Sequence, residues 1–250
     1  MRILILAAAL AVISSPAVSA PATTTATEAA IIKPSEAEAL AFVQAYSPSE
    51  LRRQAELSIL EHNFVPGMRK NPDFAALLDA YPKLGPELTK AMASQIDLYM
   101  KEYNERFYPR ATALVRGSLS EDDVRELTAF YNSALGRKML TMAAENIDAS
   151  EIIERATKNE KIDDDVAQRQ TIRSGITAIS HLSDDERAKF FQLVQSPAGQ
   201  HLKAMLPELR SIQTELMNNP GPAFQASTKK SIAAAFKRVT GLDPAQAEGK

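Results

Sequence analysis

The sequence predicts an all-α protein, an irregular helical bundle of about ten helices built around two similar helix–corner–helix units. Three observations lead to this prediction. Apolar residues recur at intervals of three and four through most of the chain, as they do on one face of a helix. No segment alternates apolar and polar residues over several positions, as a half-buried strand does. The stretch Ser118–Met139 also recurs, in altered form, as His181–Leu202.

Residues 1–20 have the pattern of a secretory signal peptide. A positive start precedes an apolar run over residues 3–13, and small residues follow up to Ala20. Cleavage after Ala20 leaves Pro21 at the new terminus, so cleavage after Ala22 is a rival. The apolar run is too short to cross a bilayer as a mature helix. We therefore expect a protein that is periplasmic or secreted after signal-peptide cleavage.

Residues 21–33 are small and polar without periodicity, which predicts a disordered linker. An N-terminal helical region is expected over residues 34–147. Ser35 with Glu38 has the spacing of a capping box and marks the first helix start. A second start follows near Pro48, and Pro66-Gly67 predicts the end of that helix.

A short helix over residues 73–81 precedes the longest helical pattern, which begins near Pro86. Large apolar residues follow one another at steps of three and four along this pattern: Leu88, Met92, Ile96, Tyr99, Tyr103 and Phe107. Pro109 lacks the N–H that a helix interior needs, so we expect it to kink or break the helix.

The first repeated unit begins with a hydroxyl cap. Ser120 stands three residues before Asp123, which acts as a shorter version of the capping-box acid. Ser133-x-x-Gly136 then predicts a sharp corner into a second helix, where the glycine lets the two helices cross closely. The corner fits either a ligand contact or a packing joint. The local backbone roles of Ser and Gly favour the packing joint.

Residues 119–138 carry a resemblance to a known family. The pattern Leu-Ser-x-x-Asp followed by Phe-Tyr-x-Ser-x-x-Gly-x-Lys is similar to the signature of the exported bacterial domain-of-unknown-function family 2059. Flanking helices over about 86–144 complete the match. The resemblance implies an exported, mostly helical protein, and it implies no particular reaction.

A C-terminal helical region with the second unit is expected over residues 148–240. Ser150 should cap one helix, and Asp163-Asp164-Asp165 should open the next through its dipole. The isoleucines of that helix are expected to be its buried face: Ile172, Ile176 and Ile179. In the second unit Ser183 pairs with Glu186 and Ser196 with Gly199, each 63 positions after its counterpart.

The second unit departs from the family signature at two places. Leu193-Val194 stands for the Phe-Tyr pair, and His201 stands for the Lys. After it, Pro207 should interrupt the next apolar stripe by a kink or break. The last helix is expected over about 223–239, followed by a flexible tail over residues 241–250.

Composition removes several classes of function. A net charge of −2 gives no basic bias toward nucleic acid, so we expect no nucleic-acid partner. The absence of Cys excludes disulfides, thiolate zinc sites and a cysteine nucleophile. Basic residues line the polar side of the last helix: Lys229, Lys230, Lys237 and Arg238. They allow contact with an anionic membrane, although a closing core helix with solvated lysines is the favoured interpretation.

Three functional hypotheses remain, and the favoured one is a non-catalytic interaction module of the cell envelope with an unknown protein or ligand as partner. The second is a small-molecule or lipid carrier whose cavity is lined by methionines: Met92, Met100, Met139 and Met142. The third is a hydrolase that uses His181 or His201 near Asp184 and Asp185. However, the first unit has Ser118 and Lys138 at the two histidine positions, which argues against a site built into the shared unit.

Tyr131 with Lys138 has the composition of an activated tyrosine, but its place in the apolar stripe favours a core role. We assign no catalytic, cofactor-binding or metal-binding residue from the sequence, and we expect no cofactor.

Overall fold

The computed structural model describes residues 32–158 and 160–243. Within them the chain forms thirteen helices and no strand, which confirms an all-α irregular bundle with more helices than the ten or so expected. The signal peptide over residues 1–20 lies outside the described residues. So do the linker, apart from Ile32 and Lys33, and positions 244–250 of the tail. No described helix is both long and apolar enough to span a bilayer.

The described residues form the following helices in chain order. The N-terminal half holds α1 (Glu36–Tyr46), α2 (Ser49–His62), α3 (Phe64–Met68), α4 (Pro72–Ala80), α5 (Leu84–Ala93) and α6 (Ile96–Ser118). The first unit is α7 (Glu121–Asn132) and α8 (Ala134–Glu145). The rest are α9 (Ser150–Thr157), α10 (Asp164–Ser180), α11 (Asp184–Gln195), α12 (Pro197–Asn218) and α13 (Pro222–Thr240).

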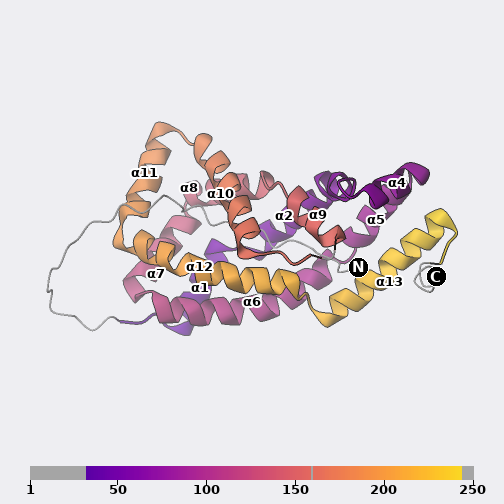
Figure 1. The fold of residues 1–250 in the computed structure, drawn as a ribbon. Coiled ribbons are helices and arrows are strands. Elements are labelled where there is room, and N and C mark those ends of the chain that lie inside the picture. The colour runs from indigo at the N-terminus through magenta and orange to yellow at the C-terminus, as the bar shows by residue number, and fades with distance from the viewer. Residues whose placement is uncertain (1–31, 159, 244–250) are drawn as a thin grey trace.

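The molecule is elongated around its two longest helices. Figure 1 shows α6 and α12 side by side along its length, with α7 and α11 at one end and α5 and α13 at the other. α1 packs against both α6 and α7. The core follows these contacts and is rich in aromatic rings from α1 and α6: Phe42, Tyr46, Tyr99, Tyr103 and Phe107.

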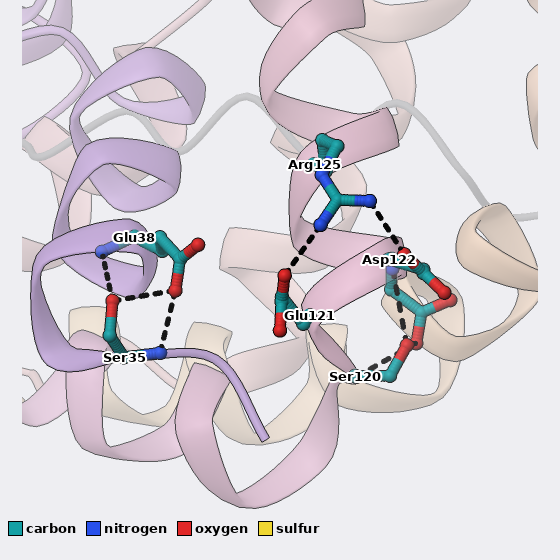
Figure 2. A network of polar contacts seen from close by, with 7 residues as sticks. Ser35, Glu38, Ser120, Glu121, Asp122 and Arg125 are labelled. Atoms are coloured by element: carbon teal, nitrogen blue, oxygen red, sulfur yellow. Dashed lines mark hydrogen bonds and ion pairs between the residues drawn. The ribbon is translucent and has the colours of Figure 1, made fainter. Parts of the chain in front are cut away.

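The starts of α1 and α7 are built alike and lie next to each other. Figure 2 shows the Ser35–Glu38 capping box beside the start of α7, where Arg125 bonds to Glu121 and Asp122. The backbone joins the two starts as well, since the amide of Glu121 donates to the carbonyl of Ile32 at 2.9 Å. Hydroxyl and acid therefore satisfy the amides that a helix start leaves open.

The predicted helix end at Pro66-Gly67 is wrong in its position, because α2 ends at His62 and Pro66-Gly67 lies inside the short helix α3. Pro109 and Pro207 lie inside α6 and α12, so the break, one of the two predicted effects of each proline, does not occur. The rings of Pro109 and Pro207 are exposed, so the carbonyl that each proline leaves unbonded can reach water.

The long pattern from Pro86 breaks instead at Ser94-Gln95, between α5 and α6. The hydroxyl of Ser94 donates to the Ala91 carbonyl at 2.7 Å, in place of a continued helix. The side chain of Gln95 bonds to two serines of α13, Ser227 and Ser231. The break thus accommodates α13, which lies more than 120 positions later in the chain and leaves no trace in the local pattern.

Two predictions for the C-terminal region are also wrong. Ile176 is 63% exposed, while Ile172 and Ile179 are half-buried and Ile179 packs against the core. The buried face of α10 is made mainly of small and polar residues instead: Val166, Ala167, Gln170, Thr171, Ser174, Gly175 and Ala178. Small residues allow neighbouring helices to approach α10 closely. Ser150 is the first helical residue of α9 and not its cap, and it donates its amide to the side chain of Asp148. Asp163 caps α10 as expected.

Candidate functional site

The two units have the same local construction. Ser120 accepts from the amide of Asp123 while the Asp123 carboxylate accepts from the amide of Ser120. Ser183 and Glu186 form the same two bonds at the start of α11. Both predicted capping boxes are therefore present, and the shorter Asp serves as well as Glu.

The two corners agree in finer detail. Ser133 accepts from the amide of Gly136, and Ser196 accepts from the amide of Gly199. A Cβ added to Gly136 would collide with the carbonyl oxygen of Phe130, six residues earlier, and one added to Gly199 would collide with that of Leu193. Both glycines are buried. The close helix crossing predicted from these glycines is confirmed in both units.

The units are tied to each other by two reciprocal pairs. Lys138 of the first unit pairs with Glu186 of the second, with Nζ 2.7 Å from Oε2. His201, which replaces that Lys in the second unit, pairs with Asp123 of the first, with Nδ1 2.9 Å from Oδ2. Lys138 corresponds to His201 and Glu186 to Asp123, so the counterparts of one pair form the other pair. This is the relation that a two-fold axis creates between identical subunits.

The environment of Asp123 keeps its side chain deprotonated. Burial raises the pKa of this carboxyl, but hydrogen bonds from Ser120 and His201 lower it by more, so the pKa lies below the ordinary value. The hydrogen bonds from Lys138 and Ser183 likewise lower the pKa of Glu186. Both acids are therefore held as carboxylates that accept from the other unit.

The structure does not bring the predicted hydrolase residues together. His201 faces Asp123 rather than Asp184 or Asp185, and its side chain is 57% exposed. His181 follows the end of α10 and is exposed, while Asp184 bonds to Arg187. No group of three or more His, Asp or Glu side chains that could hold a metal ion occurs in the described part of the chain.

Tyr131 has a structural role as well. Its ring packs edge-on against Tyr46, with centroids 5.2 Å apart, while Lys138 reaches to Glu186. Burial raises the pKa of Tyr131, which is the opposite of what an activated tyrosine requires. The phenol therefore remains neutral and forms part of a wall.

That wall belongs to an open groove of about 740 Å³ between α1, α2 and the corner of the first unit. We call it the corner groove, and it is the candidate site. It has the volume of many ligand sites. Its lining comes from three segments: Ala41, Gln44, Ala45 and Pro48; Glu50, Leu51 and Gln54; and Tyr131, Asn132, Arg137, Leu140 and Thr141.

A buried arginine holds the α1–α2 turn beside the corner groove. Arg52, 4% exposed, donates from Nη2 to the carbonyl and hydroxyl oxygens of Ser47 and from Nη1 to Asn104. Its guanidinium also lies 4.7 Å from the ring centroid of Tyr103. These bonds lock the α1–α2 turn against α6, so the groove residues from Pro48 to Leu51 are held in place.

The methionines proposed for a carrier do not line the corner groove. Met92, Met100 and Met139 are buried in the core. The groove itself has no signal in the sequence, because its residues come from three segments with ordinary amphipathic patterns. Of its lining residues, Tyr131 is the one that the sequence offers as a functional candidate, and its place in the apolar stripe favours a core role there. A buried Arg such as Arg52 has no distinctive local signal.

Comparison with known proteins gives one finding. The model of the family described as an uncharacterized protein conserved in bacteria (DUF2059) matches residues 105–151. This segment covers the end of α6, the whole first unit and the start of α9, and it agrees with the resemblance of residues 119–138. No curated protein and no solved structure matches the chain.

Proposed function

We propose that this protein is an exported, non-catalytic binding module of the bacterial cell envelope, and that the corner groove is its binding surface. The observation that carries the proposal is the groove, whose walls are fixed from behind. Arg52 locks the α1–α2 turn, and the Ser133–Gly136 corner sets the other wall. Rigid, pre-formed walls lower the entropy cost of binding a partner.

The pairing of the two units supports a binding role over a catalytic one. His201, which pairs with the Asp123 carboxylate, is the counterpart of Lys138 and makes the same type of contact between the units. Because the first unit has Lys138 at the position of His201 and makes the same contact, the contact between the units explains His201 without a role in proton transfer.

Export is tested first on the full chain expressed in a Gram-negative host. We expect the protein in the periplasmic or culture fraction, with a mass corresponding to cleavage after Ala20 or Ala22. An uncleaved chain of 27.3 kDa in the cytoplasmic fraction would contradict export.

Partner binding is tested by site-specific photo-crosslinking in living cells of a bacterium that makes this protein. The crosslinking residue is placed at Gln44 or Thr141, which are exposed in the corner groove. The matched control is Lys229, which is exposed on α13 at the other end of the molecule (Figure 1). We expect a discrete adduct from the groove positions and none from Lys229. Adducts from neither set, with folded protein, would overturn the proposal.

A further inference from the structure

Resting on the proposed function, we infer that the corner groove binds an extended peptide segment of its partner that carries an acidic and a basic side chain around apolar residues. The inference follows from three properties of the lining: apolar side chains, two opposite charges that form no ion pair within the described residues, and side-chain amides without hydrogen bonds there.

Part of the groove lining is apolar and partly open to solvent. Leu51, Pro48 and the ring of Tyr131 are half-buried, and Ala41 is exposed. Leu140 also lines the groove and is buried. Apolar side chains of a ligand would remove these surfaces from water, which supplies non-directional affinity.

Two charges stand on different walls. Arg137 of α8 is exposed, and its guanidinium forms no hydrogen bond or ion pair with any described residue. Among the described residues Glu50 of α2 forms no ion pair within 4 Å and accepts a long bond of 3.3 Å from Gln54, and its charge helps to raise the pKa of Arg53. The groove therefore offers one cation and one anion to a ligand, and a ligand with one acidic and one basic group satisfies both.

Amide side chains complete the lining. Gln44 and Asn132 are exposed in the groove and have no side-chain hydrogen bonds within the described ranges. A carboxamide both donates and accepts, which matches the alternating N–H and C=O groups of an extended backbone. An anionic lipid would pair with Arg137, but it would leave these amides without hydrogen bonds and would be repelled by Glu50. The lining thus favours a peptide over a lipid.

The test uses acetylated, amidated pentapeptides and the isotope-labelled mature protein. Glu-Leu-Ala-Leu-Lys and its reverse are titrated by NMR, with a Gln-Leu-Ala-Leu-Gln peptide as the neutral comparison and oleate as the lipid comparison. We expect saturable shifts at Gln44, Leu51 and Asn132 with a charged peptide, and affinity lower by roughly fivefold for the neutral peptide.

A charge-reversal variant gives the sharper readout. Arg137→Glu leaves two acidic walls, so we expect roughly fivefold weaker binding of the Glu/Lys peptide and stronger binding of Lys-Leu-Ala-Leu-Lys. Arg116→Glu is the matched control, because Arg116 is exposed at the end of α6, across the length of α7 from the groove. It should leave the preference unchanged.

Shifts that saturate with oleate alone, or a preference that Arg137→Glu does not alter, would overturn this inference. Groove crosslinks to a partner would then still support the proposed function. If neither peptides nor crosslinks engage the groove, both proposals fail together.

Discussion

Lys138 of the first unit pairs with Glu186 of the second. Their counterparts in the other unit, His201 and Asp123, each offset by 63 positions, pair as well. Both ties join the second helix of one unit to the first helix of the other. The two units are therefore related by a local two-fold axis, although their side chains have diverged.

The Asp123 carboxylate should stabilise the protein in a pH-dependent way. Its pKa is lower in the folded chain than in the unfolded chain, where it is about 3.9. Its contribution is therefore complete above that value and is lost as pH falls through the folded pKa. We expect Asp123→Asn to lower the free energy of unfolding by about 1–2 kcal/mol at pH 7, measured in urea.

The same comparison at pH 3 should give a smaller difference between Asp123→Asn and the parent. Asp122→Asn is the control, since Asp122 is exposed and its removal should cost under about 0.5 kcal/mol. A loss that is equal at pH 3 and pH 7 would mean that charge plays no part in the role of Asp123.

The tie at His201 should accept the residue that the other unit uses. His201→Lys should keep the parent stability, because Lys138 makes the equivalent pair. His201→Ala should cost under about 1 kcal/mol, since the ring is more than half exposed. Thermal unfolding of the two variants checks this. If His201→Lys unfolds as early as His201→Ala, the equivalence of the two ties is wrong.

The corner glycines should not tolerate a methyl group. Gly136→Ala and Gly199→Ala each place Cβ against a backbone carbonyl, which cannot move aside without displacing a helix. We expect each to lower the free energy of unfolding by about 2–4 kcal/mol. Gly117→Ala is the matched control, because a Cβ there meets nothing within 4 Å. It should be neutral or stabilising by up to about 1 kcal/mol.

Arg52 should matter through the shape of its guanidinium. Arg52→Lys keeps the charge but cannot reach both Ser47 and Asn104 while lying over the Tyr103 ring. We expect both Arg52→Lys and Arg52→Met to lose about 2–4 kcal/mol of unfolding free energy in urea. Arg53, which is only partly buried and pairs with Asp97, serves as control through Arg53→Lys. Equal effects at the two arginines would argue against the anchoring role.

Local signals account for most of what the sequence predicts correctly. The capping boxes at Ser120 and Ser183 and the corners at Gly136 and Gly199 depend on residues within a few positions of one another. The spacing of these residues in the sequence is therefore enough to predict the caps and the corners. The all-α class follows from the same kind of evidence, summed over many segments.

The predictions that are wrong concern features that depend on residues far apart in the sequence. The break at Ser94-Gln95 exists to meet α13, and the exposure of Ile176 depends on which neighbours cover α10. The corner groove joins α1, α2 and α8, and the His201–Asp123 pair spans 78 positions. Such features are decided by packing between distant segments, which local periodicity does not encode.

The reciprocal ties have a consequence for how such a chain arises and changes. A surface that complements its own copy needs one gene to supply both partners, and fusing two copies makes their association independent of protein concentration. Once joined, each half faces a single fixed neighbour, so one copy can exchange lysine for histidine without the other having to follow. Under the proposed function, the corner beside Tyr131 serves recognition, while the corner of the second unit keeps a structural role.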